Sequence, residues 1–445
     1  MASEILLDVL RRATEQGATE ADGYLVEERQ FSAQVRLGQV ETVVHSRDQR
    51  LALRVFVGRA SASASTSDLS RDSLERLIED ATGLARITGE DRLAGLPDPA
   101  TLIRGVPDLD LTDPRGHDLT LEEKIALARR GEEAALALDP RITNSEGAEF
   151  FDRRSTYTYA TSHGFSGSYS GSTFGLTVSP VAAANGEMQR DTWYSATRKR
   201  ARLESPEEVG RTAARRALRR LGARRVKTAE VPVVFDAETV AGLVGAVAGA
   251  ASGPALYRGT SFLQNRLGKR IASSMVTIVD DGAIPAALGS KPFDGEGLAV
   301  KRTTVVGGGA LESYLLDTYS ARKLGLASTH HASRTGSGVG VATNNLVLQP
   351  GDASPEALIR SVKSGLYVTE LIGFGVNFVT GDYSRGAVGL WIENGELAYP
   401  VEEVTIAGNL LEMLDAVDGI GNDLVLRDVT AAPTVKIARM VVAGQ

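Results

Sequence analysis

The sequence predicts an α+β fold: two N-terminal units of helices on antiparallel sheets, followed by a larger β-rich C-terminal domain. The order helix, alternating strand-like segments, helix occurs twice in the first half of the chain. A stretch with four prolines separates the two occurrences, and beyond residue 226 the chain becomes rich in glycine, valine and tight turns. We therefore expect units at 1–87, 120–225 and 226–445, with a linker over 88–119.

The first unit opens with a helix that periodic apolar residues extend to about residue 16. Strand-like segments with alternating apolar residues follow at 23–35, 40–45, 50–57 and 60–65. A second helical pattern over 70–87 closes the unit. This order predicts a unit of helices on an antiparallel sheet.

The second unit repeats this order without sequence identity to the first. Thr120 and Glu123 form a capping-box pattern before a helix that ends near residue 138, at an Asp-Pro pair. Strand-like segments follow at 142–151, 155–162, 167–178 and 186–197. Ser205, a proline and two glutamates begin the closing helix, whose last turns carry arginines at the negative end of the dipole.

The C-terminal region alternates short apolar runs with tight turns, which is typical of a sheet with many hairpins. Helical patterns at 237–252 and 355–364 are expected to pack against it. The apolar stretch 240–256 is short and interrupted by glycines and a proline, so we interpret it as a buried helix and not as a membrane span.

The composition excludes several classes of protein. A net charge of −7 argues against nucleic-acid binding, which requires many basic residues against phosphates. The absence of cysteine excludes disulfides and thiolate zinc sites. The N-terminus has acidic residues within its apolar stretch and does not have the order of a signal peptide. These features favour a cytoplasmic protein.

Several motifs occur in an order that resembles one family. They are 144–147 (Asn-Ser-Glu-Gly), 162–169, 252–263, 289–297, 314–325 and the long run 365–410, which contains Gly-Phe-Gly-Val-Asn and Gly-Asp-Tyr-Ser-Arg-Gly. Together, over about two-thirds of the chain, they resemble the TldE (PmbA) branch of the TldD/TldE metallopeptidase family.

This resemblance implies a role without zinc chemistry. TldD members hold zinc with a helical His-Glu-x-x-x-His motif, and no histidine here precedes a glutamate. The five histidines are His45, His117, His163, His330 and His331. Where TldD members place the zinc helix, this chain has Gly-Ala-Val-Ala-Gly-Ala-Ala-Ser at 245–252, which supplies neither ligand nor general base.

By resemblance we expect a noncatalytic subunit that pairs with a TldD-like zinc peptidase and encloses a chamber for unfolded or precursor peptides. We expect no cofactor in this chain, with zinc in the partner. Two alternatives remain. One is a stand-alone metallopeptidase with an atypical site at His330 and His331, completed by Glu370, Asp382 or Asp294. The other is a homodimeric peptide-binding protein.

The candidate peptide or partner contacts are Glu370, Asp382, Tyr383, Arg385 and Arg322. Residues 382–386 are expected to form a loop in which a tyrosine offers a stacking surface and an arginine offers a fork of donors. An Asp382–Arg385 ion pair that fixes a hairpin is the other interpretation. For His330 and His331, the interpretation without a metal is a solvent-facing loop.

Overall fold

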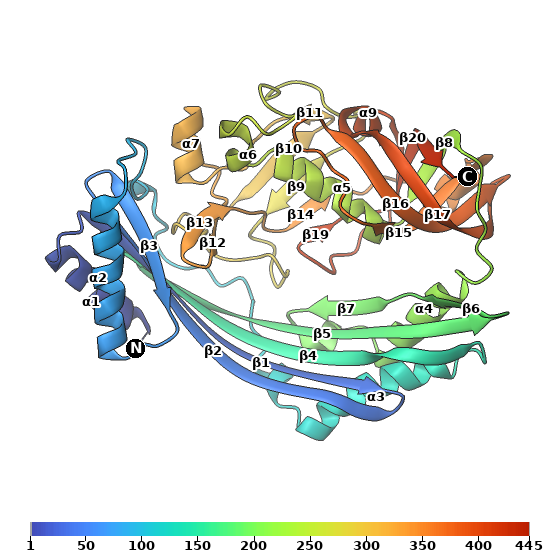
Figure 1. Cartoon of the computed structure of the whole chain (residues 1–445), viewed down its shortest axis with the longest axis horizontal. Helices are drawn as coiled ribbons and strands as arrows, with labels where there is room; N and C mark the ends of the chain where they lie inside the picture. Colours follow the sequence, from blue (N-terminus) through green and yellow to red (C-terminus); the bar gives the residue numbers. More distant parts are fainter. Residues whose placement is uncertain (1, 445) are drawn as a thin grey trace.

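The computed structural model describes residues 2–444, apart from the side chain of Thr335, and it confirms the α+β class. One long curved antiparallel sheet, a half-barrel, lies below a separate C-terminal body (Figure 1). Within the described residues the order of this seven-stranded sheet is β3-β2-β1-β4-β5-β6, with β7 also paired to β5. Its strands are β1 (Glu20–Arg36), β2 (Gln39–Val57), β3 (Ala60–Thr66), β4 (Ile142–Thr161), β5 (Ser166–Ala184), β6 (Glu187–Arg190) and β7 (Trp193–Thr197).

The two predicted helix-and-sheet units share this single sheet. Strand β1 pairs with β4 along residues 22–35, so the second unit continues the sheet of the first. The segments 40–45 and 50–57, expected as separate strands, form the single strand β2. Alternating apolar residues indicate which face of a strand is buried, but they do not indicate which strand lies beside it.

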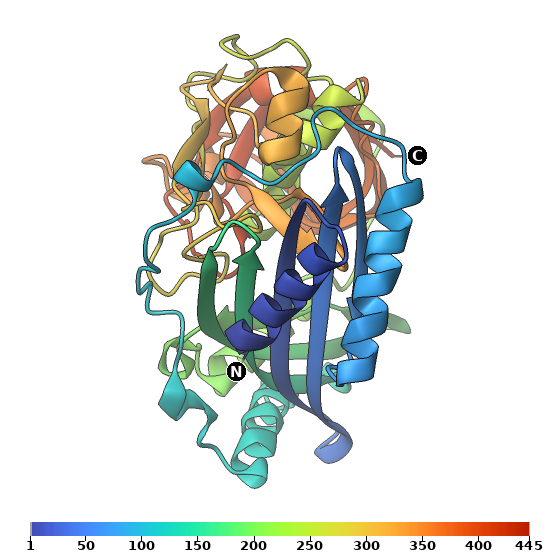
Figure 2. The same cartoon turned by 90° about the vertical axis from the view of Figure 1, so that its left-hand side faces the viewer.

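Two pairs of helices cover the convex face of the sheet (Figures 1 and 2). The pair α1 (Ala2–Glu15) and α2 (Arg71–Ile87) buries Leu6, Leu25 and Ile78 at one end. The pair α3 (Leu121–Leu136) and α4 (Pro206–Leu218) buries a second core at the other end, which includes Phe150 and Phe174.

The helix starts read from the sequence are confirmed in this unit. Thr120 and Glu123 form a reciprocal capping box at α3, and the Ser205 side chain accepts a hydrogen bond from the Glu208 backbone at α4. The segment between the two helix pairs carries two short 3₁₀ turns, η1 (Pro99–Thr101) and η2 (Pro114–His117), and a third, η3 (Arg200–Arg202), precedes α4.

The C-terminal domain is β-rich, as expected, and contains two main sheets and a hairpin. One sheet has the order β11-β10-β9-β14-β19, and the other has the order β17-β16-β15-β8-β20-β18, with a further β17–β20 pairing that makes it barrel-like. Strands β12 and β13 form the hairpin. The strands are β8 (Ala229–Phe235), β9 (Ile278–Asp281), β10 (Arg302–Gly307), β11 (Ala310–Leu311), β12 (Ala332–Thr335), β13 (Gly338–Val341), β14 (Leu346–Leu348), β15 (Ser364–Ile372), β16 (Asp382–Glu393), β17 (Glu396–Asn409), β18 (Val417–Ile420), β19 (Thr430–Ala431) and β20 (Val435–Ala443).

The helices of this domain are α5 (Ala237–Ala250), α6 (Gly253–Tyr257), α7 (Thr318–Leu324), α8 (Pro355–Arg360) and α9 (Leu410–Asp415). Helix α5 packs against β14, β15 and β19, so it lies in the core between the two sheets. Among the helices of residues 2–444, none combines the length and apolar character that a membrane crossing requires.

Candidate functional site

Helix α5 carries most of the glycine- and alanine-rich segment 245–252, for which the family resemblance led us to expect no metal ligand. Asp236 caps its N-terminus, and one side of the helix is buried in the domain core through residues such as Val240, Val244 and Val247. The other side presents Gly242, Gly245 and Gly249, spaced three and four residues apart. A methyl group at residue 245 would meet no atom within 4 Å, whereas one at residue 242 would lie 3.6 Å from Arg385 and one at residue 249 would lie 3.0 Å from the Phe378 ring, so this face is open only at Gly245.

A loop at 373–381 crosses beside this glycine face. The Phe378 ring lies against Gly249, and the Phe262 backbone N–H donates to the Phe378 carbonyl at 2.8 Å. The Ser384 N–H donates to the carbonyl of Gly375 at 2.7 Å, and a Cβ on residue 375 would lie only 1.6 Å from the Ser384 carbonyl oxygen. The loop is therefore held against the domain by its backbone and by the Phe378 ring, while Phe374 projects from it fully exposed.

Four large apolar side chains of this region are exposed to solvent. Phe374 is fully exposed, and Ile372, Phe378 and Val379 are between 40% and 56% exposed. We call these four residues the apolar loop. Our sequence reasoning did not single them out. The available signal was the pattern of apolar residues between glycines, Gly-Phe-Gly-Val-Asn-Phe, in which Phe374 is left uncovered and Phe378 is partly exposed.

The segment expected to form a loop at 382–386 is instead the first part of strand β16, so that expectation was wrong. Tyr383 is buried and offers no stacking surface. Asp382 accepts from the hydroxyl of Thr380 at 2.6 Å, and Arg385 donates to the carbonyl of Leu371 at 3.4 Å. In the part of the chain that the structure describes, no Asp382–Arg385 ion pair forms, so the hairpin interpretation was also wrong.

Glu370 and Arg322 are both engaged with this chain. A carboxylate oxygen of Glu370 lies 2.5 Å from a guanidinium nitrogen of Arg220, which links β15 to the segment after α4, and 43% of the Glu370 side chain is exposed. Arg322, on α7, donates to the carbonyls of Leu93, Gly95 and Leu96 at 2.7–3.0 Å. Arg322 thus joins the C-terminal domain to the linker.

The two adjacent histidines do not lie in a solvent-facing loop, because His331 is buried. Its Nε2 lies 2.9 Å from Asp280 Oδ2, and its Nδ1 lies 2.9 Å from the Thr329 hydroxyl. The Nδ1 of His330 lies 2.6 Å from the carbonyl oxygen of Ala299, and burial lowers the pKa of His330. The two rings therefore have separate partners, and His331 belongs to a buried polar network.

The carboxylates considered as a third ligand are occupied elsewhere. Asp294 accepts backbone hydrogen bonds from Glu296, Leu298 and Ala332. Within residues 2–444, no group of three His, Cys, Asp or Glu side chains is placed to hold a metal ion.

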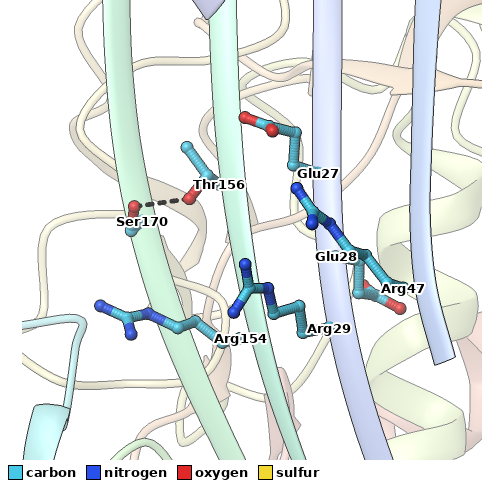
Figure 3. Close-up of a pocket in the computed structure, with 7 residues that line it drawn as sticks. All are labelled: Glu27, Glu28, Arg29, Arg47, Arg154, Thr156 and Ser170. Carbon is cyan, nitrogen blue, oxygen red and sulfur yellow. Dashed lines mark hydrogen bonds between the residues drawn. The ribbon is translucent and has the colours of Figure 1, made fainter. Parts of the chain in front are cut away.

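A groove of about 260 Å³ opens on the convex face of the sheet, at strand positions between the two helix pairs (Figure 3). Arg29 lies directly opposite Arg47 on one neighbouring strand and Arg154 on the other. A hydrogen bond of 2.8 Å joins the hydroxyls of Thr156 and Ser170 beside this row. The arginines are exposed, and Glu27 and Glu28 also line the groove, so we interpret it as a solvated charged face.

Fold and site together define a class: a multidomain α+β protein with a helix-backed half-barrel and a barrel-like C-terminal domain. The chain belongs to the PmbA/TldD metallopeptidase family. The family models described as PmbA/TldA metallopeptidase domain 1, central domain and C-terminal domain match residues 21–85, 114–221 and 228–444. The expected family membership is thereby confirmed.

The similarity to known proteins extends over nearly the whole chain. It is 38% identical to the metalloprotease PmbA of Escherichia coli O157:H7, over 99% of this chain and 97% of that protein. The crystal structure of a Bacteroides thetaiotaomicron protein aligns with a TM-score of 0.92 and 29% identity, over 99% and 98% of the two chains. TldE of Thermococcus kodakarensis has the same fold, with a TM-score of 0.89 and 21% identity over 99% and 100%.

Proposed function

We propose that this chain is a noncatalytic TldE/PmbA-type subunit that pairs with a TldD-like zinc peptidase, and that the pair encloses a chamber for proteolysis of unfolded or leader peptides. The observation that carries this proposal is the exposed apolar loop beside a helix face, at Gly242, Gly245 and Gly249, that offers no metal ligand. The chain belongs to a metallopeptidase family, and in this proposal the partner subunit supplies the zinc and cleaves the peptide.

The residues of α5 support a zinc site in the partner and not in this chain. Zinc in a peptidase needs three protein ligands and a nearby general base. The side of α5 away from the core offers glycines at 242, 245 and 249, which have no side chain to coordinate a metal. The same face lets another backbone or side chain approach closely, which suits a subunit contact.

The apolar loop supports a protein partner. Exposed apolar side chains that gather in one place mark interaction sites, and buried aromatic anchors supply much of the affinity at interfaces. Phe374 and Phe378 are such aromatic groups, and the loop that carries them is held by backbone contacts to Phe262 and Ser384. A preorganised loop loses little conformational entropy on binding.

The first experiment measures cleavage of an unfolded peptide by this chain alone, by a candidate TldD-type partner alone and by the mixture, with bound zinc quantified in each. Cleavage only in the mixture, with zinc in the partner, would support the proposal. Cleavage by this chain alone, with stoichiometric zinc that His331→Ala removes, would overturn it and favour the stand-alone metallopeptidase.

Phe374→Ser tests the docking surface. The ring is fully exposed, so the variant should fold normally while its affinity for the partner falls by about 30-fold or more, as for an interface hot spot. Met188→Ser is the matched control, because Met188 is a 72% exposed apolar residue in β6, on the N-terminal sheet. Equal affinities for wild type and Phe374→Ser would exclude the apolar loop as the contact.

A homodimeric peptide-binding protein is the second candidate, and the edge of β2 favours it. Residues 51–57 of β2 pair with β3, whereas the described residues provide no strand on that side for 39–50. Val40, Val43 and Val44 are exposed along this edge. A stable homodimer in gel filtration that does not exchange with a TldD-type partner would favour this function.

A further inference from the structure

A second cavity of about 260 Å³ lies between the N-terminal sheet and the C-terminal domain. Its floor is formed by Tyr24, Tyr157 and Tyr169, on the adjacent strands β1, β4 and β5. The ring centroids are 6.2 Å apart for Tyr24 and Tyr157 and 5.0 Å apart for Tyr157 and Tyr169. The three rings form a continuous aromatic surface, which we call the tyrosine floor.

The C-terminal domain supplies the roof of the cavity, through residues 288–295 and 332–334. Figure 1 shows the β12–β13 hairpin on the side of this domain that faces the sheet. The Phe293 ring meets Tyr169 edge-on, with the centroids 5.3 Å apart. Since floor and roof come from different domains, the cavity exists only in the assembled fold.

The cationic groups of the cavity differ in how they are satisfied. Arg334 is paired with the buried carboxylate of Asp22. Arg198 donates to four backbone carbonyls, including those of Ala287 and Leu288, so its hydrogen-bonding capacity is used without a counter-ion. For Lys291, the described residues provide neither a side-chain hydrogen bond nor an ion pair.

The acid beside Lys291 does not neutralise it well. Burial, together with the neighbouring carboxylate of Glu296, raises the pKa of Asp294 to about 7. Burial also lowers the pKa of Lys291 and outweighs the opposite effect of the carboxylates of Asp294 and Asp280, neither of which forms an ion pair with it. The cavity therefore carries excess positive charge, and the ammonium of Lys291 is a cationic donor without an ion-pair partner among the described residues.

Size and chemistry restrict the ligand. Pockets that hold drug-sized molecules measure about 300–1,000 Å³, so this cavity is suited to a group the size of one or two residues. One ammonium with three donors matches a monoanion, and the tyrosine floor matches an apolar or aromatic group. A dianionic phosphate would need a second unpaired cation beside Lys291, and Arg334 and Arg198 are already engaged with other groups.

We propose that this cavity binds a terminal carboxylate attached to a large apolar side chain, with the carboxylate at Lys291 and the side chain against the tyrosine floor. The ligand is the C-terminal residue of a peptide or a free amino acid of this kind. This binding needs only the chain itself, so its test does not depend on the peptidase partner.

The test uses ligand-observed NMR titrations of the full chain with four probes: N-acetylphenylalanine, its amide, the tripeptide Ala-Ala-Phe and its amide. Both acids should bind at least about 10-fold more tightly than the matching amides, because the amides do not carry the charge that Lys291 recognises. Tighter binding of the tripeptide would identify a peptide C-terminus as the source, and equal binding would identify the free amino acid.

Lys291→Met should abolish the preference for acids, and Lys291→Arg should restore part of it. Lys301→Met is the control, because Lys301 is an exposed lysine of the same domain outside the cavity. Equal binding of acids and amides to the wild type, an acid preference that survives in Lys291→Met, or no binding of any probe at about 10 mM would each overturn the proposal.

Discussion

Asp22→Asn tests the ion pair that joins the N-terminal sheet to the C-terminal domain. Asp22 is completely buried in β1, and its Oδ2 accepts from a guanidinium nitrogen of Arg54 at 2.7 Å and from the Tyr159 hydroxyl at 3.0 Å. Arg334, from the β12–β13 hairpin, also donates to this carboxylate and is only 1% exposed. One carboxylate thus holds two arginines from different domains.

The free-energy cost of Asp22→Asn follows from the partners that each arginine keeps after the substitution. Arg54 keeps the carboxylate of Glu296 at 3.6 Å. Arg334 keeps only the carbonyl of Gly295 and contacts with tyrosine faces, so its charge is left buried without a counter-ion. Removal of one partner of a buried ion pair costs about 3–5 kcal/mol, and we expect a loss of this size in the free energy of unfolding.

Urea unfolding monitored by tryptophan fluorescence measures this loss. The chain has two tryptophans, Trp193 in the sheet and Trp391 in the C-terminal domain, so single-tryptophan variants report the two domains separately. Asp8→Asn is the control, because Asp8 forms an exposed ion pair on α1 that should contribute less than about 1 kcal/mol.

A loss below about 1 kcal/mol for Asp22→Asn would refute the reasoning. The double variant Asp22→Asn with Arg334→Met provides a further check, because it removes the orphaned charge. If the argument is right, the double variant is more stable than Asp22→Asn alone, and the double-mutant cycle gives a coupling energy of about 2 kcal/mol or more.

The same pair predicts a dependence of stability on pH. Burial by itself would raise the pKa of Asp22, but the charges of Arg334 and Arg54 outweigh it and hold the pKa at about 2. The folded pKa is therefore below the unfolded value of about 3.9. The stabilisation is complete above about pH 4 and is lost as the pH falls through about 2, and Asp22→Asn should not show this loss.

Three further predictions concern stability. For Asp294, whose folded pKa of about 7 lies above its unfolded value, the stability of the wild type relative to Asp294→Asn should fall by about 2–3 kcal/mol between pH 5 and pH 8; a constant difference would contradict the assigned burial effect. Arg29→Gln should raise the free energy of unfolding by about 0.2–1 kcal/mol in urea titrations, because it relieves repulsion by the arginines opposite it, and a loss would show that the row is structural. Gly245→Ala should stabilise α5 by up to about 1 kcal/mol, whereas Gly375→Ala should cost about 1–3 kcal/mol because its Cβ would overlap a carbonyl oxygen; similar melting temperatures for the two variants would contradict both assignments.

Features encoded within a few residues were predictable from the sequence. The caps at Thr120 and Ser205 are confirmed because the groups that form them lie within three residues of each other. The order of helices and strands and the family motifs are likewise local patterns. The absence of metal ligands at 245–252 was also predictable, because the sequence alone gives the residue type at each position.

Features that depend on distant contacts were not predictable. The burial of His331 depends on Asp280, 51 residues away, and Tyr383 is buried because the segment that carries it extends a strand of the C-terminal sheet. Alternation of apolar residues within one strand does not indicate these neighbours. Both predictions failed for this reason.

The sequence by itself determined the family, the order of the elements and the glycines of α5. Only the tertiary structure decided that two units share one sheet, that Arg334 reaches Asp22 across 312 residues, and that Lys291 faces the tyrosine floor without a counter-ion. The physical reason is that charge pairing, burial and cavity shape depend on which distant segments become neighbours, and the local pattern of residues does not specify that.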